Sequence, residues 1–396
     1  MDAHRHRHSA LTIVAVGLAA LASAMGVGRF AFTPLLPLMQ AHDGLSLGQG
    51  AWLAGANYLG YAVGALACSV WPPAPGAAAR FGLVAVAIST LAMGVTGNYE
   101  VWLALRFGAG VASAYVLVGV SVWAMTALGE QGRTAWSGWV FSGVGVGIAV
   151  AGAASLVAGI EGDEPARVWL LLGALSAAVA AIAWIPMRGV APAAATSAPP
   201  SHPAARREWR LVACYAAFGF GYIVPATFLP AMARAEIADP AVFGWVWPAF
   251  GTTAAASTAL VAAFFQRVPP RRVWATSLFV MAGGVLAPAL WPGVWSLLVA
   301  AVCVGGTFMV ATLAGLQEAR RLAGPAATRL MATMTAAFAL GQLSGPIVVG
   351  LATSQSHGIV GPSVLGAALL LAGGFALLRP EPAVDPIAPQ LERNRP

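Results

Sequence analysis

Two arginines lie inside long apolar stretches of this sequence, where a charged side chain is costly. Arg29 is the only charged residue between Arg7 and Asp43, and Arg106 lies within the apolar run 101–128. A guanidinium at the centre of a membrane costs about 3 kcal/mol even on lenient insertion scales. Its planar fork of donors suits a carboxylate or a phosphate. We therefore expect Arg29 to bind an anionic substrate; hydrogen bonds to helix carbonyls or snorkelling to the membrane surface are the alternatives.

Arg106 and several uncharged polar residues are further candidates for the same site. Arg106 lies in the predicted outer half of its helix, as Arg29 does, so it either faces the same cavity or ties its helix to its neighbours. Interhelical hydrogen bonds, worth about 0.6 kcal/mol each, are the simpler explanation for any single polar residue. Five side chains complete the predicted substrate-binding set: Asn57, Tyr58, Tyr115, Tyr222 and Gln342.

No Asp or Glu lies well inside any apolar stretch, and this absence bears on the energy source. Glu100, Glu130, Glu161 and Glu318 fall at predicted helix ends or in loops. Proton-coupled carriers often use an intramembrane carboxylate, so coupling here requires a helix-end carboxylate, a proton carried on the substrate, or anion exchange. The six histidines lie outside the stretches and the three cysteines are far apart. We therefore expect no metal site, no cofactor and no enzyme activity.

The composition indicates that lipid is the solvent. Of 396 residues, 59% are hydrophobic and 9% are charged, whereas about 25% of the residues of a soluble domain are charged. An apolar stretch of roughly 20 residues must be helical to cross a membrane. Twelve such stretches are predicted: 10–39, 47–71, 80–97, 101–128, 135–160, 168–187, 211–232, 241–265, 273–290, 294–316, 330–354 and 359–378. The expected fold is therefore an all-α polytopic membrane protein, and the net charge of +7 does not indicate a nucleic-acid partner.

The arginines predict the orientation of the chain and the position of a linker. Of the 21 basic residues, 17 lie on the side of the amino terminus when the loops are numbered alternately. By the positive-inside rule, both termini are cytoplasmic and the protein is a multi-pass component of the inner (plasma) membrane. The Pro-, Ala- and Arg-rich segment 188–210 indicates a flexible cytoplasmic linker. The expected parts are a tail 1–9, a six-helix bundle 10–187, the linker, a second six-helix bundle 211–378 and a tail 379–396.

An internal repeat relates the two predicted bundles. At an offset of 193 residues, one set of matching residues lies over the other: Ala24, Gly26, Gly28, Leu36, Pro37 and Met39 over Ala217, Gly219, Gly221, Leu229, Pro230 and Met232. The same offset puts Trp52 over Trp245, Arg29 over Tyr222 and Tyr115 over Phe308. Parallel repeats of this kind are typical of transporters that bind substrate near the membrane midplane between two halves.

Glycine and proline residues predict where helices pack closely or bend. The glycine strings neither follow a strand nor open a βαβ unit, which excludes a nucleotide-binding loop. Small residues four positions apart let helices approach closely, and proline removes a helix hydrogen bond. Close packing is expected at Gly108, Gly110, Gly143 and Gly147, and bends or gating positions at Pro34, Pro37, Pro225, Pro230 and Pro248.

Several sequence runs resemble the major facilitator superfamily (MFS) over essentially the whole chain. The run RFGAG, residues 106–110, is similar to an Arg and Gly motif of that superfamily. The runs GVGRFAFTPLLPLMQ, AWLAGANYLGY, YVLVGVSVW and GFGYIVPATFLPAMAR resemble its YbfB/YjiJ-type branch. The loop WPPAPGAAAR departs from the superfamily because it lacks the Asp of the usual GxxxDR-type motif, and SGVGVGIAVAG lacks a Gly-Pro pair. The resemblance implies twelve helices in two pseudo-symmetric bundles.

These observations predict a secondary active transporter that moves a small organic anion by alternating access. Efflux of amphipathic compounds is the alternative within transport, because Trp and Phe residues would line an apolar pocket. A non-transporting membrane sensor is the alternative from a different class, and a sizeable soluble output domain would distinguish it. The expected partners are a small-molecule substrate, a coupling ion where transport is ion-driven, and the lipid bilayer, with the protein acting as a monomer.

Overall fold

The computed structural model describes residues 8–188, 202–236, 244–291, 293–324, 327–353 and 360–379, and all regular structure in these ranges is helical. The first half of the chain forms α1 (Ala10–Leu21), the π-helical segment η1 (Ala22–Val27), α2 (Phe32–His42), α3 (Leu47–Val70), α4 (Pro75–Val95), α5 (Tyr99–Glu130), the 3-10 turn η2 (Thr134–Trp136), α6 (Ser137–Glu161) and α7 (Pro165–Trp184). The second half forms α8 (His202–Glu236), α10 (Val246–Phe264), α11 (Pro270–Leu290), α12 (Val294–Ala323), α13 (Ala327–Thr353) and α14 (Val360–Leu378).

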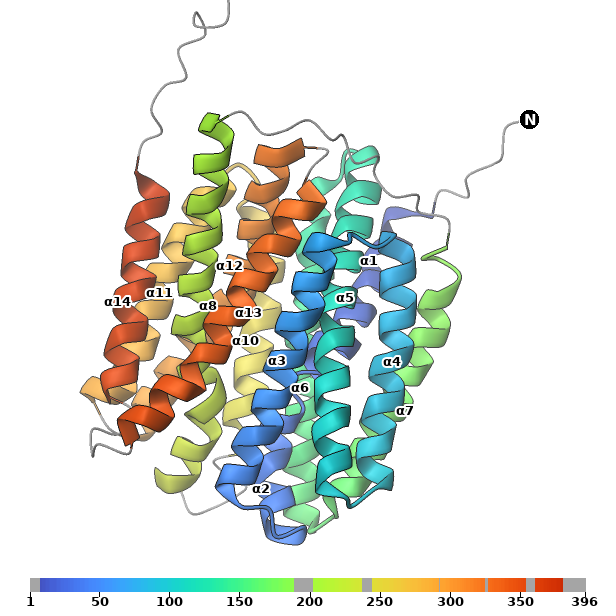
Figure 1. Cartoon of the computed structure of the whole chain (residues 1–396), viewed down its shortest axis with the longest axis vertical. Helices are drawn as coiled ribbons and strands as arrows, with labels where there is room; N and C mark the ends of the chain where they lie inside the picture. Colours follow the sequence, from blue (N-terminus) through green and yellow to red (C-terminus); the bar gives the residue numbers. More distant parts are fainter. Residues whose placement is uncertain are drawn as a thin grey trace, which may run out of the picture.

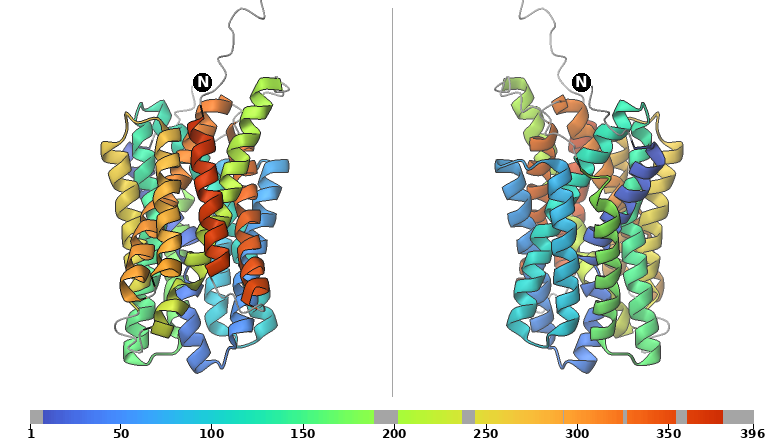
Figure 2. Two further views of the ribbon diagram at one scale, coloured as in Figure 1. Left: turned by 90° about the vertical axis from the view of Figure 1, so that its left-hand side faces the viewer. Right: turned by 90° about the vertical axis from the view of Figure 1, so that its right-hand side faces the viewer.

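These helices form twelve rods within the described residues, because α1, η1 and α2 together make one rod (Figure 1). Ten of the described rods are long and apolar enough to cross a membrane. The other two, α8 and α13, lie among them in the same bundle and run in the same general direction (Figures 1 and 2). The predicted all-α polytopic fold is confirmed.

The rods divide into two halves that lie side by side. The helices α1 to α7 make up one half and α8 to α14 the other, with α6 against α10 and α3 against α13 at the junction. The start of α1, the start of α8 and the end of α14 lie at the same end of the bundle (Figure 1). We call this the terminal end. At this end, Gln131 donates a hydrogen bond to the carbonyl oxygen of His8, and Arg271 donates one to the carbonyl oxygen of Arg379.

Two predicted boundaries differ from the structure. Helix α8 begins at His202, inside the segment predicted as a linker, while residues 189–201 lie outside the described part of the chain. Helix α12 continues to Ala323, beyond the predicted end at residue 316. A helix that extends past the apolar run carries polar residues on its last turns, and an apolar-stretch count cannot register them. The tails 1–7 and 380–396 also lie outside the described residues.

Glycines set how closely the helices approach one another. A Cβ on Gly110, Gly143 or Gly147 would collide with the backbone of a neighbouring helix, at Asn57, Leu18 and Ala22 respectively. Gly108 differs from this expectation, because a Cβ there would lie 3.8 Å from Ser89 Oγ, an ordinary contact. Across the junction, Gly145 and Gly251 approach the backbone of Ala255 and Ala149. The two halves therefore meet along α6 and α10 with little more than backbone between them.

Candidate substrate site

The first rod is broken next to the central site, and Pro34 explains the break. Proline has no N–H to donate to the carbonyl of Phe30, and the N–H of Thr33 bonds to that same carbonyl at 3.3 Å. Residues 28–31 form a turn between η1 and α2. The carbonyl oxygens of Gly28 and Arg29 lie in this turn and need hydrogen-bond donors from outside the helix.

Arg106 and Asn57 supply those partners. The two terminal nitrogens of Arg106, on α5, donate to the carbonyl oxygens of Gly28 and Arg29, both at 3.1 Å. Asn57, on α3, donates to Gly28 O at 3.3 Å and to Arg106 O at 2.9 Å. Both side chains are buried, with Arg106 3% exposed and Asn57 0%. They tie three helices together at the break and compensate the Arg106 charge with carbonyl dipoles.

Arg29 itself points the other way, into the centre between the halves. Its side chain is 2% exposed, and its guanidinium carbon lies 3.7 Å from the centroid of the Tyr61 ring and 5.3 Å from that of Phe30. Arg29 Nη2 donates to Gln342 Oε1. Nε and Nη1 have no hydrogen-bond partner among the described residues, and no acidic side chain there is ion-paired with this arginine.

Two polar contacts cross between the halves at this level. Gln342 on α13 accepts from Arg29 and donates through Nε2 to Tyr222 Oη at 2.7 Å. Tyr58 Oη on α3 lies 3.2 Å from Thr227 Oγ1 on α8. The first contact joins the only buried charge that faces the centre, among the described residues, to a polar pair of the opposite half.

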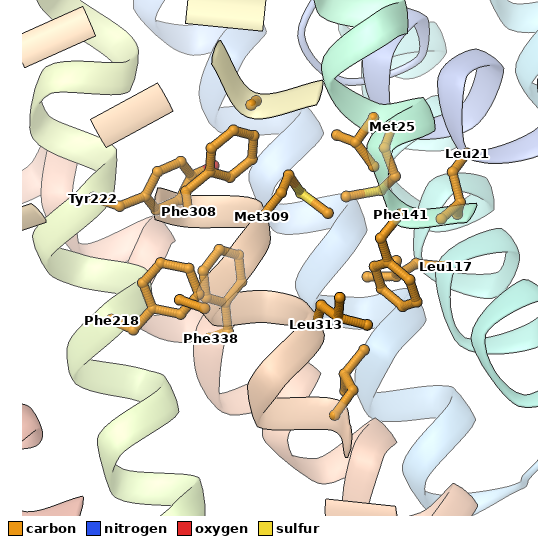
Figure 3. Packing of buried hydrophobic residues seen from close by; sticks show 14 of the residues in the cluster. Leu21, Met25, Leu117, Phe141, Phe218, Tyr222, Phe308, Met309, Leu313 and Phe338 are labelled. Carbon is orange, nitrogen blue, oxygen red and sulfur yellow. The ribbon is translucent and has the colours of Figure 1, made fainter. Parts of the chain in front are cut away.

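Aromatic side chains surround the Arg29 guanidinium. A cavity of about 20 Å³ is lined by Met25, Arg29, Phe30, Tyr61, Leu117, Tyr215, Tyr222, Phe308, Met309, Thr312, Thr335 and Phe338. Tyr222 is stacked with Phe308, at 5.6 Å between centroids and 6° between planes, and with Phe338 at 5.4 Å and 21°. Figure 3 shows these rings on one side, with Met25 and Leu117 from the other half facing Met309 and Leu313. A space of this size holds about one water molecule, so the site is contracted.

A larger cavity of about 450 Å³ lies at the terminal end between the halves. It is lined by Met125 and Thr134 from one half and by Val310, Leu313 and Arg320 among others from the second. Leu313 lies one turn along α12 from Met309, which lines the central cavity. A hydrogen bond of 3.2 Å from Gln317 Nε2 to Ser137 Oγ crosses the halves beside this larger cavity.

The comparisons with known proteins identify the family. The sequence matches the family described as "Uncharacterised MFS-type transporter YbfB" over residues 21–378. The chain belongs to this family of MFS-type transporters. No curated protein sequence matches it.

Two solved structures share the fold of the transporter. The nucleoside transporter NupG, in a mutant form, has 15% identity and a TM-score of 0.63, over 92% of this chain and 99% of that one. The human organic anion transporter MFSD10 (TETRAN) has 14% identity and a TM-score of 0.70, over 93% of this chain and 100% of that one. At these identities the similarity shows the fold alone. The family match over residues 21–378 shows that the protein is a membrane transporter of a small-molecule substrate rather than an enzyme.

The structure brings part of the predicted site together. Arg29, Tyr222 and Gln342 form one hydrogen-bonded chain at the centre, and Tyr58 lies at the same junction. Arg106 and Asn57 lie behind Arg29, at the helix break. Tyr115 lies elsewhere, packed with Cys68, Val118 and Ala332 where α3, α5 and α13 meet.

The predicted proline positions differ from one another in the structure. Pro34 follows the break in the first rod, and Pro37 lies inside α2. Pro225 and Pro230 lie within α8, which is assigned as one helix from His202 to Glu236. Pro248 lies in the first turn of α10, where its ring contacts Gly152 of the other half. The structure interrupts the first rod, and the bends expected at Pro225, Pro230 and Pro248 stay predictions.

Sequence reasoning did not select the aromatic residues that enclose Arg29. Phe30, Tyr61, Tyr215, Phe308 and Phe338 all line the cavity. Apolar aromatics are common on membrane helices, so residue type alone does not mark them. The usable signals were the proximity of Phe30 to Arg29 in sequence and the position of Tyr61 one turn beyond Asn57.

One acidic residue also requires a correction. Because α12 extends to Ala323, Glu318 lies inside a helix rather than at its end, and it is 4% exposed. Arg321 Nη1 lies 3.7 Å from Glu318 Oε2. A carboxylate therefore does lie within a helix of the transporter, near its terminal end.

Proposed function

We propose that the transporter carries a small organic anion and that Arg29 binds its negative charge. The observation that carries this proposal is the missing counter-charge of the Arg29 guanidinium among the described residues: its side chain is 2% exposed, and two of its three nitrogens have no hydrogen-bond partner there. A buried charge without a counter-charge is costly. A bound anion would remove that cost and use the free donors.

Arg106, the second buried arginine, does not need a bound anion. Arg106 donates from both terminal nitrogens to two backbone carbonyls at the helix break, and only Nε has no partner among the described residues, so carbonyl dipoles compensate most of its charge. We therefore assign Arg106 and Asn57 to positioning of the Arg29 backbone and only Arg29 to the substrate. Of the two fold neighbours, one is titled a nucleoside transporter and the other an organic anion transporter. Since fold does not decide substrate, the charge at the centre favours the anion.

Alternating access would follow from the contacts between the halves. The Arg29 to Gln342 and Tyr58 to Thr227 contacts cross at the centre, and Gln317 to Ser137 crosses at the terminal end. Rocking of one half on the other along α6 and α10 would exchange these contacts and open the site to alternate sides. We assign the terminal end to the cytoplasmic side of the inner membrane, because most arginines flank that end. We keep a monomer as the expected assembly.

The aromatic lining supports the second candidate, efflux of amphipathic compounds. Six of the residues around the cavity are aromatic, and a neutral or cationic amphiphile would pack against them. Such a solute would leave Arg29 without a counter-charge, which is why the anion is the first choice.

Thermal unfolding in nanodiscs tests the proposal. The protein is heated with panels of organic anions, organic cations and neutral amphiphiles, both as wild type and as Arg29→Gln. A ligand at about 100 times its Kd adds roughly 2.7 kcal/mol of stability. We expect anions to stabilise the wild type and not the variant. Equal stabilisation of both proteins by cations or neutral compounds would overturn the anion assignment in favour of efflux.

A further inference from the structure

Besides the Arg29 guanidinium, the polar side-chain groups that line the central cavity are the hydroxyls of three tyrosines and two threonines. The hydroxyl groups of Thr312 and Thr335 donate to the carbonyls of Phe308 and Met331 in their own helices, at 2.9 and 2.8 Å. These two hydroxyls therefore do not face a solute as free donors. A polyhydroxylated solute would regain only part of its hydrogen bonds to water in such a lining. A second negative charge would also find no second cation here.

The rings around Arg29 favour a flat apolar body. Tyr222 lies between Phe308 and Phe338 in two stacked pairs, with planes 6° and 21° apart. Phe308 also meets Phe30 edge-on and Phe250 at a tilt, with centroids 6.0 and 5.3 Å apart. Aromatic groups gain from both stacked and edge-to-face neighbours. A planar ring can therefore join this cluster by exchanging one such contact for another.

Gln342 occupies one of the two positions on Arg29 that suit a carboxylate. A guanidinium offers two pairs of neighbouring donors, Nε with Nη2 and Nη1 with Nη2, and a carboxylate uses one pair. Nη2 has two hydrogens, one for each pair, and it donates one of them to Gln342 Oε1. Nε and Nη1 have no partner among the described residues. One complete donor pair is therefore open to a carboxylate while Gln342 stays in place.

We propose that the substrate is a flat aromatic monocarboxylate that binds the donor pair of Arg29 left free by Gln342 and places its ring among Tyr222, Phe308 and Phe338. This inference rests on the proposed function and narrows its substrate class. The polar chain from Arg29 through Gln342 to Tyr222, which joins the two halves, can persist while the carboxylate binds. The cavity of about 20 Å³ must widen to admit the ring.

Five probes that differ by one property at a time test the substrate class on the wild-type protein. They are benzoate, its neutral amide benzamide, the dianion terephthalate, the non-planar acid cyclohexanecarboxylate and acetate, with Kd measured from the rise in Tm in nanodiscs. We expect benzoate to bind about tenfold or more tightly than each of the others, equivalent to about 1.4 kcal/mol. A benzoate Kd no lower than that of benzamide, terephthalate, cyclohexanecarboxylate or acetate contradicts the proposal, and so does absence of benzoate binding.

Two variants test the arrangement at Gln342. Gln342→Leu keeps the volume and removes the oxygen that takes one Nη2 hydrogen, so Arg29 has one compensating contact fewer and benzoate should bind a few-fold more tightly. Gln317→Leu is the matched control, because it makes the same substitution at another contact across the halves that does not line the central cavity; benzoate binding should change less than about threefold. Weaker benzoate binding by Gln342→Leu would show that Gln342 is a substrate ligand and would overturn the use of the free donor pair.

The outcomes separate this inference from the proposed function. If acetate and terephthalate bind as well as benzoate and all are lost in Arg29→Gln, the organic-anion function stands and the aromatic class is wrong. If benzoate binds Arg29→Gln as tightly as it binds the wild type, both are wrong. Arg29→Lys keeps the charge without the planar fork, and we expect it to bind benzoate about tenfold more weakly.

Discussion

The two halves of the transporter repeat one helical plan, but only the first half carries charge at its centre. Where the first rod has Arg29, α8 has Tyr222, and where α3 has Asn57, α10 has Phe250. Helix α12 has no charged residue from Val294 to Leu316, whereas α5 has Arg106. In our account the first half fixes the anionic group and the second half receives the apolar body. A repeat can therefore supply symmetric motion and an asymmetric site.

The same comparison holds for the backbone. The first rod breaks between η1 and α2 and needs Arg106 and Asn57 to satisfy its carbonyls. Its counterpart α8 is assigned as one helix, although Pro230 corresponds to Pro37 in the repeat. The break turns the Arg29 backbone towards α5 and its side chain towards the centre. The break and the two arginines therefore form one connected structural feature of the first half, which α8 does not repeat.

Removing Arg106 should have the largest effect on stability. Arg106→Leu leaves Arg29 O at the break without its donor and Gly28 O with Asn57 as its donor, so we expect a loss of about 3 kcal/mol. Arg80→Leu is the matched control, because Arg80 is half-buried and donates only to Gly76 O in its own helix; it should cost less than about 1 kcal/mol. Denaturation in detergent measures both. Equal losses would show that the break does not depend on Arg106.

A methyl group at the junction of the halves should cost about 2 kcal/mol. In Gly145→Ala the added Cβ would meet the backbone of Ala255 across α6 and α10, which forces the halves apart. The control is Gly108→Ala, where the nearest atom would be 3.8 Å away; it should be neutral or stabilising by up to about 1 kcal/mol. Tm in nanodiscs distinguishes them. If Gly108→Ala were destabilising and Gly145→Ala neutral, the tight contact would lie at Gly108 and not at the junction of the halves.

Asn57 should contribute less than Arg106. Asn57→Ala removes two hydrogen bonds, to Gly28 O and Arg106 O, and should destabilise the protein by about 1.5 kcal/mol. Because both bonds position Arg29 rather than touch the substrate, anion affinity should fall only a few-fold. Unfolding and binding measurements on the same variant check this. A complete loss of binding with unchanged stability would make Asn57 a substrate ligand.

The contact at the terminal end should have the smallest effect. Gln317→Ala removes the hydrogen bond to Ser137, which is worth about 0.5–1 kcal/mol. We expect little change in Tm and a shift towards the conformation open at that end, measured as faster labelling of a cysteine introduced at Ala314 in the larger cavity. An unchanged labelling rate would show that this hydrogen bond does not hold the terminal end closed.

The sequence predicted the helices, and it singled out three residues that meet at the centre of the bundle, because each rests on a local or repeated signal. Arg29 is conspicuous as an isolated charge in an apolar run, and the repeat places Tyr222 opposite it. The structure joins both through Gln342. The role of Arg106 could not be read from its residue type, because it depends on a break in another helix and on three-dimensional contact with carbonyls there.

The position of Tyr115 was misjudged for a geometric reason. The offset of 193 residues paired Tyr115 with Phe308, but only Phe308 lines the cavity. Matching close contacts, Gly110 on Asn57 O and Gly305 on Phe250 O, place the offset at 195 for α5 and α12. Two residues turn a helix by about 200°, which moves a side chain to the opposite face.

Uptake into proteoliposomes tests the central claim most directly. Radiolabelled benzoate uptake is measured for the wild type, Arg29→Gln and Arg29→Lys, all reconstituted to the same folded amount. We expect the wild type to take up benzoate, and we expect unlabelled benzoate, but not benzamide, to inhibit this uptake. Arg29→Gln should show no uptake above that of empty liposomes, and Arg29→Lys should show reduced uptake. Uptake by Arg29→Gln at the wild-type rate would contradict the claim that Arg29 binds the substrate's charge.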